Sequence, residues 1–359
     1  MVGGQPKSQP VLKKTSRGQT WRILTSLRSL GRRNEKPKWD PIFRLELDSR
    51  PGLLSAGVTF FRGNDGALSI KICSGMKSCR ACGSSNTGLL FEIEQRRVRR
   101  CSECTHVYLD VVHNAESIRN MYSAYGNGGQ SHYFAGIDRE VEANLDGYLQ
   151  RCRTTVRNQN SQLHLLDVGC GNGALLKRAQ AHGFVAAGVE ISAPLASLVK
   201  DQLRCEVYQQ FLSELDLPES SFDVVTMYDL IEHAENPRQD LEHVFRILRS
   251  GGVFFALTPN DQALLRRISR VLFAASLHSF SDPMRRLYYP DHLSYFTARS
   301  LARLLESTGF ELISLESVNQ ELSRVQLSQI EKLAARTAFW ASKPFSGLGG
   351  KLVVYARKP

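Results

Sequence analysis

The chain has 359 residues, of which 42% are hydrophobic, and a formal net charge of +11. This length is enough for one large core and a smaller module. No apolar run approaches the ~18 residues of a membrane-spanning helix, and no apolar h-region of a secretory signal follows the basic start, which excludes both kinds of segment.

The positive charge is concentrated at the N-terminus. Residues 1–75 hold 14 of the 46 Lys and Arg residues but 5 of the 35 Asp and Glu residues, so this head carries +9 and the rest of the chain +2. Because phosphate contacts need clustered cations, the near-neutral remainder argues against a nucleic-acid partner. We expect residues 1–75 to be disordered or non-native, with translation starting at Met76 as one reading. A transit peptide and a membrane-surface helix are the alternatives.

Four of the eight cysteines form a metal-binding pattern within residues 76–112. Cys79 and Cys82, then Cys101 and Cys104, make two C-x-x-C pairs with 18 residues between them. Each pair directs two thiolates at one point, so the spacing predicts a structural zinc site, with a redox pair as the lesser alternative. The other four cysteines are scattered, which favours a reducing, cytoplasmic setting over a disulfide framework.

Residues 113–160 are expected to connect this segment to the next domain through helices. Ile137, Val141, Leu145 and Leu149 recur at four-residue spacing. This periodicity predicts an amphipathic helix that packs its apolar face on a sheet.

A strand, a glycine-rich turn and a helix start follow one another from residue 163. Residues 163–168 are an apolar strand, Gly169, Gly171 and Gly173 alternate in the turn, and a helical pattern begins at Ala174. Glycine permits positive φ and a close approach of ligand to backbone, and the free N–H groups of a helix start attract an anionic ligand group. This arrangement predicts a ligand site at the edge of an α/β sheet.

A second short strand ends in Glu190, 21 positions after Gly169. An acidic side chain at this place can accept hydrogen bonds from ribose hydroxyls. The two strands together predict a nucleoside-containing cofactor.

Two further segments resemble motifs of class I S-adenosylmethionine-dependent methyltransferases. Residues 220–233 read Ser-Ser-Phe-Asp-Val-Val-Thr-Met-Tyr-Asp-Leu-Ile-Glu-His, similar to that family's fourth strand. Residues 248–260 read Leu-Arg-Ser-Gly-Gly-Val-Phe-Phe-Ala-Leu-Thr-Pro-Asn, similar to its fifth. The resemblance implies an α/β fold, with a Rossmann-like seven-stranded sheet over residues 161–359, an antiparallel last strand and S-adenosylmethionine as cofactor. The cysteine segment resembles the zinc ribbon that precedes this domain in bacterial methyltransferases of sugar and natural-product pathways.

The resemblance also implies which residues contact the cofactor. Asp167 should bind its methionine end and Glu190 its ribose, while Phe211 stands where many relatives have an acidic residue that contacts adenine. This departure leaves stacking and backbone contacts for adenine. The full predicted set is Asp167, Gly169, Cys170, Gly171, Glu190, Ile191, Phe211 and Tyr228.

Asp229, Glu232 and His233 fall at i, i+3 and i+4, which predicts one face of a helical turn after the fourth strand. A similar pattern holds a divalent cation in related quinone-pathway O-methyltransferases; the alternative is a cluster that only caps and packs. His233 and His292 are the candidate proton acceptors, because imidazole titrates near neutral pH. Glu232 lies on the same side of the site. His292 lies within the insertion 261–296 that follows the fifth strand, and residues 282–296 of this insertion are expected to be a loop.

The sequence therefore predicts an enzyme that methylates a small-molecule acceptor: a sugar, a polyketide or a quinone-like metabolite. The alternative is a zinc-ribbon RNA methyltransferase or a non-catalytic RNA-binding protein. One basic cluster in the ribbon hairpin would serve that alternative: Arg96, Arg97, Arg99 and Arg100.

Overall fold

The computed structural model describes residues 78–94, 96–111, 139–157, 162–279, 281–319 and 347–359, four strands before them, and single helical positions at 333, 336, 337 and 340. The first part of the predicted connector, with Ile137, lies outside these residues. The chain divides into two compact units, Met1–Met76 and Lys77–Pro359.

The first unit contains a small antiparallel sheet with the strand order β1-β2-β4-β3. Its strands are β1 (Val11–Lys14), β2 (Trp21–Leu24), β3 (Ala56–Arg62) and β4 (Leu68–Ser74). Residues 21–24 therefore form a strand, whereas a membrane-surface helix was one of the alternatives for residues 1–75.

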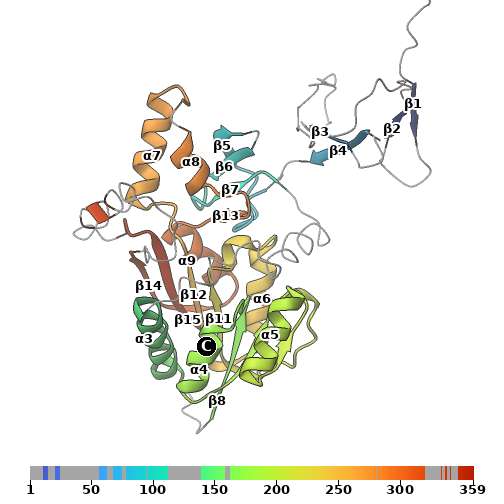
Figure 1. The fold of residues 1–359 in the computed structure, drawn as a ribbon. Coiled ribbons are helices and arrows are strands. Elements are labelled where there is room, and N and C mark those ends of the chain that lie inside the picture. Colours follow the sequence, from blue (N-terminus) through green and yellow to red (C-terminus); the bar gives the residue numbers. More distant parts are fainter. Residues whose placement is uncertain are drawn as a thin grey trace, which may run out of the picture. The chain divides into compact units, whose positions relative to one another are not determined.

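A seven-stranded sheet forms the centre of the second unit, with the order β10-β9-β8-β11-β12-β15-β14 (Figure 1). Its strands are β8 (Leu163–Val168), β9 (Phe184–Val189), β10 (Val207–Tyr208), β11 (Phe222–Tyr228), β12 (Leu248–Pro259), β14 (Glu311–Val318) and β15 (Lys351–Arg357). Strands β8 to β12 are parallel, and β15 is antiparallel to both β12 and β14. The chain runs outward from β8 to β10 and returns to β11 on the other side of β8. The predicted fold is confirmed, and the reversal of strand order between β8 and β11 marks its ligand edge.

Helices cover both faces of this sheet. The helices are α3 (Arg139–Thr155), α4 (Ala174–Ala181), α5 (Ala193–Leu203), α6 (Pro237–Ile247) and α9 (Ala298–Ser307). Neighbouring side chains of β12 point to opposite faces: the Phe255 ring lies 5.1 Å from Tyr148 of α3, while Phe254 lies 5.6 Å from Phe310, which contacts Phe245 of α6. Among the described helices, none has the length and apolar content to cross a membrane.

The cysteine-rich ribbon and the insertion after β12 share one sheet. Ribbon strands β5 (Thr87–Ile93), β6 (Arg96–Cys101) and β7 (Val107–Leu109) continue into β13 (Ser294–Tyr295) of the insertion, in the order β13-β7-β6-β5 (Figure 1). Strand β13 is antiparallel to β7. The insertion therefore completes the ribbon sheet.

The two segments also share one hydrophobic core, in which Val98 and Val107 of the ribbon pack with Phe273 and Tyr288 of the insertion. The insertion forms helices α7 (Leu264–Ala275) and α8 (Asp282–Leu287) before β13. The predicted loop over residues 282–296 is therefore wrong for α8 and β13. The partner of β13 lies far away in the sequence, so a local pattern could not reveal this pairing.

Candidate active site

The glycine-rich turn after β8 is held against β9. The backbone N–H groups of Gly169 and Cys170 donate to the Val189 carbonyl oxygen, at 2.8 and 3.0 Å. Gly169 has a φ of 75° and Gly173 a φ of 80°, in the left-handed region that glycine adopts without strain. A Cβ atom at Gly169 would lie 2.6 Å from the Leu230 side chain. The turn needs glycine both for its conformation and for its contact with the segment after β11.

Glu190, directly after β9, faces this turn. One carboxylate oxygen accepts from the Gly171 N–H at 2.9 Å and the other from the Ser192 N–H at 2.8 Å. Burial raises the pKa of Glu190, and these N–H groups partly offset the rise. Each carboxylate oxygen can accept a further bond, and the buried Ser192 hydroxyl has no hydrogen-bond partner among the described residues. These groups fit the hydroxyls of a ribose.

Asp167 occupies the neighbouring position, near the end of β8. Its side chain is buried and accepts a hydrogen bond from the Thr226 hydroxyl of β11 at 2.7 Å. Burial raises its pKa to about 7; the Thr226 bond opposes this rise, and the charge of Glu190 adds to it. Asp167 therefore joins β8 to β11 at the point where the strand order reverses.

The other predicted cofactor residues follow the carboxyl ends of neighbouring strands. Ile191 comes after β9, Phe211 after β10, and Tyr228 ends β11, and all three are half-buried. Cys170 is buried in the turn, and a Cβ atom at Gly188 would lie 2.7 Å from its sulfur. The structure thus brings the predicted set to one edge of the sheet, while their contacts with a cofactor stay a prediction.

Glu232 lies beside this edge, on the short 3-10 helix η3 (Ile231–His233) that follows β11. The side chain is 1% exposed, and one of its oxygens accepts from the Thr258 hydroxyl of β12 at 2.9 Å. The other oxygen has no hydrogen-bond partner in the part of the chain that the structure describes. Burial raises the pKa of Glu232 to about 8, with the charge of Asp229 adding to the shift and Lys351 opposing it. The group is therefore mainly a neutral carboxylic acid at pH 7.

Two histidines from distant parts of the chain meet at Glu232. The rings of His233 and His292 lie edge to face with centroids 4.7 Å apart. One ligand atom of each, with one from Glu232, lies within 4.8 Å of the others. The backbone joins the two segments, because the Leu293 N–H donates to the Glu232 carbonyl oxygen at 2.9 Å.

The tautomer of His233 follows from its contact with Asp291. His233 Nδ1 lies 2.9 Å from the Asp291 carbonyl oxygen, which can only accept, so Nδ1 carries the proton and Nε2 is the unprotonated nitrogen. Burial lowers the pKa of His233, and the Asp291 carbonyl partly offsets this. The pKa of His292 is lowered much further, by burial and by the nearby positive charges. Of the two imidazoles, His233 is the stronger base.

Asp229 does not join this group. Its φ is 52°, and its carboxylate pairs with the Lys351 ammonium of β15. The i, i+3, i+4 spacing predicted one helical face for Asp229, Glu232 and His233, and this prediction is wrong. The chain instead forms a left-handed residue at Asp229 and a 3-10 turn after it. His292 stands where Asp229 was expected.

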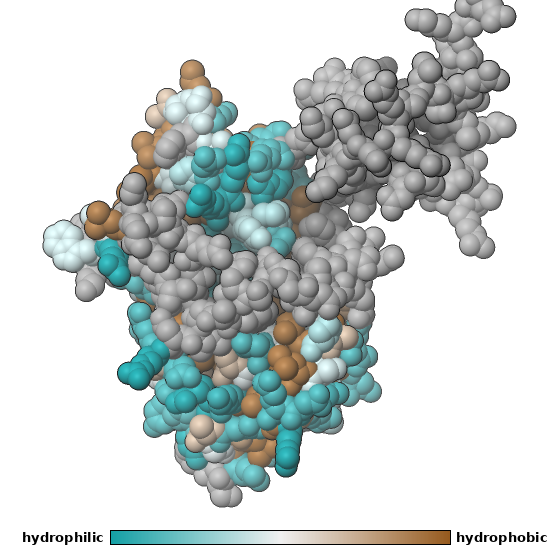
Figure 2. Space-filling model, in the orientation of Figure 1, coloured by the Kyte–Doolittle hydropathy of each residue, from teal (hydrophilic) through white to brown (hydrophobic). Residues whose placement is uncertain are grey.

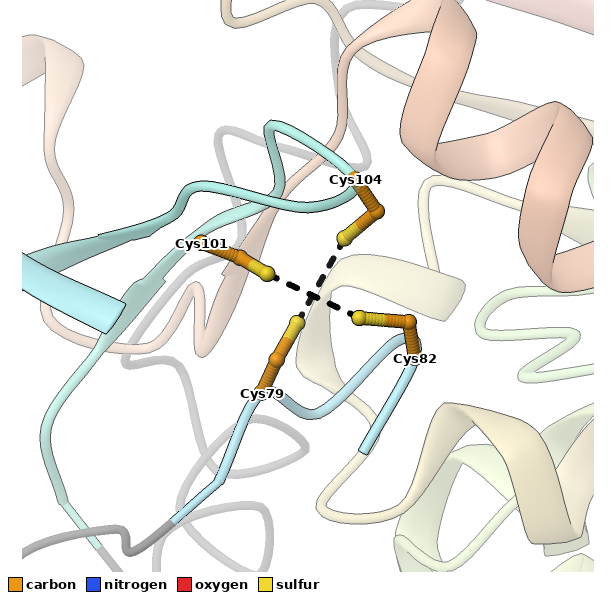
Figure 3. A group of neighbouring side chains, drawn as sticks. All are labelled: Cys79, Cys82, Cys101 and Cys104. Carbon is orange, nitrogen blue, oxygen red and sulfur yellow. Dashed lines mark hydrogen bonds between the residues drawn. The ribbon is translucent and has the colours of Figure 1, made fainter. Parts of the chain in front are cut away.

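The four cysteines converge on one point (Figure 3). The sulfur atoms lie 3.6 Å apart in the pairs Cys79–Cys104 and Cys82–Cys101. Ligands at about 2.3 Å from a tetrahedral zinc ion stand about 3.8 Å from one another, close to these distances. Burial raises the pKa of Cys82 to about 11, so this thiol holds a proton that a metal ion would displace. The cluster fits a closed tetrahedral metal site.

Sequence reasoning missed three groups beside the site. Thr258 and Lys351 hold the carboxylates of Glu232 and Asp229, and Arg266 of the insertion stacks on tyrosines. Of these three, the sequence could have pointed to Thr258, because it lies in the segment that resembles the fifth strand of a methyltransferase.

Comparisons with known proteins place this site in a family. Residues 137–315, about half of the chain, match the family model described as a methyltransferase domain. A ubiquinone biosynthesis O-methyltransferase of Coxiella burnetii is 27% identical over 166 residues, which cover 43% of this chain and 69% of that protein. A probable S-adenosylmethionine-dependent methyltransferase of Mycolicibacterium smegmatis is 31% identical over 150 residues, or 41% of this chain and 52% of that protein.

Among solved structures, the [4+2]-cyclase SpnF has the same fold, with a TM-score of 0.50 and 18% identity over 69% of this chain and 97% of that one. The sheet order and the ligand edge define a Rossmann-like methyltransferase fold. With the family match and the relatives, they show that the chain belongs to the S-adenosylmethionine-dependent methyltransferases. The predicted class of enzyme is confirmed.

Proposed function

We propose that the protein methylates a hydroxyl group of a small-molecule acceptor, with His233 as the proton acceptor. The observation that carries this proposal is the group of Glu232, His233 and His292, which lies beyond the ends of β11 and β12 and next to the turn expected to bind the cofactor. An oxygen acceptor is consistent with the quinone O-methyltransferases among the relatives. A sugar, polyketide or quinone-like metabolite fits this description.

The residues of the chain have separate tasks in this reaction. When bound, S-adenosylmethionine would supply an electrophilic methyl group for the acceptor oxygen, with its sulfur as the leaving group. His233 would take the proton of the acceptor hydroxyl at Nε2. The Asp291 carbonyl keeps His233 in the tautomer that can accept this proton. The neutral carboxyl of Glu232 can donate a hydrogen bond to the acceptor.

We also propose one structural zinc ion at the four cysteines of the ribbon. Four thiolates leave no open coordination position, so this ion would stabilise the ribbon and take no part in the chemistry. Because the ligands must be reduced thiols, a cytoplasmic setting suits the protein.

A divalent cation is a second way in which Glu232, His233 and His292 could act. Two imidazoles and a carboxylate are a common set of ligands for such ions. The low pKa of both histidines favours the neutral rings that a metal binds, but Glu232 would have to lose its proton. Chelation separates this role from the metal-free one, which needs no ion.

The RNA alternative receives little support from the ribbon arginines. Arg97 and Arg99 lie 3.9 and 3.6 Å from the Asp110 carboxylate, and Arg96 donates to the Tyr288 carbonyl oxygen at 3.0 Å. These arginines hold the ribbon together, which leaves Arg100 as the exposed member of the cluster. We propose a small-molecule acceptor instead, and salt-sensitive binding of RNA to the protein without residues 1–75 would contradict this.

Histidine variants test the proposed base. We expect His233→Ala to lower turnover on the true acceptor by ~10²–10⁴-fold, with unchanged affinity for S-adenosylmethionine. His292→Ala should have a smaller effect, because its ring is the weaker base. Full turnover in both variants and in the double variant would reject a histidine base. Loss of turnover on EDTA treatment, restored by Mg²⁺ alone, would instead favour the cation.

A further inference from the structure

Helix α7 of the insertion buries an arginine and exposes apolar residues. Arg266 is 6% exposed and faces inward with Ser269 and Phe273. The opposite side of the helix exposes Leu265, Ile268, Val271 and Leu272, and Figure 2 shows hydrophobic residues on the surface at α7. A surface helix usually has the reverse arrangement. Burying a cation in place of a leucine costs stability, so Arg266 needs another explanation.

The surroundings of Arg266 provide aromatic faces but no anion. Its guanidinium carbon lies 5.0 Å from the centroids of both the Tyr288 and the Tyr295 rings. The adjacent carboxylate, Asp261, is taken by Arg270 at 2.8 and 2.9 Å and by the Tyr288 hydroxyl at 3.0 Å. Within the described ranges, Arg266 forms no ion pair, and its buried Nη1 has no hydrogen-bond acceptor. An unpaired buried charge of this kind is rare in proteins unless a ligand completes it.

Arg266 is also close to the candidate active site. The ring of Tyr295, on which it stacks, lies 6.1 Å from the ring of His292, and His292 contacts His233. Two more buried polar atoms lack hydrogen-bond partners among the described residues: Nδ1 of His292 and one oxygen of Glu232. Arg266 Nη1, His292 Nδ1 and this Glu232 oxygen are thus three buried polar atoms that could bond to a ligand.

The charges of the site favour an anion. Asp229 is paired with Lys351 and Asp261 with Arg270, so these four groups compensate one another. Over the residues that the structure describes, Arg266 is left with a charge that no carboxylate balances. A planar guanidinium between two aromatic rings is well suited to hold a carboxylate or a phosphate through two parallel hydrogen bonds.

We propose that Arg266 binds an oxyanion of the acceptor, a carboxylate or a phosphate group, and so orients its hydroxyl toward His233. This inference rests on the proposed small-molecule reaction and adds the class of acceptor: an acidic metabolite rather than a neutral one. Arg266 acts as a specificity residue, and Tyr288 and Tyr295 fix its position.

The test measures oxyanion binding without knowledge of the acceptor. The full chain with bound S-adenosylhomocysteine is titrated with inorganic phosphate and with benzoate, and binding is followed by the line widths of the ³¹P and ¹H signals. We expect the wild type to bind at least one of the two and Arg266→Met to weaken its binding roughly 10- to 100-fold. Arg267→Met is the matched control, because Arg267 lies in the same helical turn and is exposed. It should bind as the wild type does.

If the wild type binds phosphate more tightly, the oxyanion of the acceptor is a phosphate group; if it binds benzoate more tightly, the oxyanion is a carboxylate. Failure of the wild type to bind either probe, or equal binding by Arg266→Met, would overturn the inference. If Arg266→Met no longer binds S-adenosylhomocysteine, Arg266→Lys replaces it as the test variant, because lysine keeps the charge but loses the paired N–H groups. We expect Arg266→Lys to bind the oxyanion more weakly than the wild type. An unchanged Kd for the oxyanion overturns the inference. None of these results depends on the turnover of the His233 variant, so the proposed base can fail or stand separately.

Discussion

Replacing Arg80 by methionine should release the ribbon from the catalytic sheet. The Arg80 side chain is 1% exposed, and it donates to the Glu235 carboxylate at 2.5 Å, to the Glu235 carbonyl oxygen at 2.6 Å and to the Val111 carbonyl oxygen. Removing one partner of a buried ion pair costs about 3–5 kcal/mol, and the 25% exposure of Glu235 favours the lower end of this range. We therefore expect a loss of about 3 kcal/mol, since methionine retains most of the packing.

Hydrogen exchange can locate this loss. Because each 1.4 kcal/mol changes an opening equilibrium tenfold, amide protection in β6, β7 and β13 should fall roughly 100-fold, while β8 and β9 keep theirs. Arg100→Met is the matched control, because Arg100 is exposed in the same ribbon. Equal protection in the two variants would refute the view that Arg80 connects the ribbon to the site. Since β13 follows His292, turnover should fall together with this protection.

Three further outcomes are expected. Elemental analysis of protein purified without chelators should find one zinc ion per chain, and Cys101→Ser should lose it. The raised pKa of Glu232, about 8 in the fold, means that its contribution to stability is present below about pH 4.5 and is lost as the pH rises through 8. Urea unfolding should therefore show Glu232→Gln close to the wild type at pH 5 and more stable than it at pH 9; parallel pH profiles would contradict the neutral carboxyl. Deleting residues 1–75 should leave cofactor affinity unchanged in calorimetry, and loss of binding would show that the first unit supports the enzyme.

Short-range patterns predicted the strands, the turn and the helix at the edge where the cofactor is expected. The strand, the glycine turn and the helix that follow Leu163 lie within about twenty residues, and Glu190 ends the next strand. These features depend on contacts between segments that are close in the sequence, such as the hydrogen bond from the Gly171 N–H to the Glu190 carboxylate across 19 positions. Hydrophobic periodicity and turn chemistry are informative at this range.

The acceptor side depends on pairings that no local pattern encodes. Asp229 meets Lys351 across 122 positions, which removes it from the group predicted with Glu232 and His233. Strand β13 has two residues and exists because β7 of the ribbon pairs with it. Arg266 shares helix α7 with Arg267 and Arg270, and only its burial between two tyrosines distinguishes it. Tertiary contacts decide all three, so sequence reasoning found the histidines but not their surroundings.

The binding of S-adenosylmethionine at the turn between β8 and α4 is the central claim, and calorimetry tests it most directly. Titration of the cofactor into the wild type and into Glu190→Ala compares the two proteins under the same conditions. Loss of the ribose hydrogen bonds should weaken binding by about 1–3 kcal/mol, or roughly 5- to 150-fold in Kd. No heat of binding in the wild type, or equal affinity in both proteins, would contradict the account.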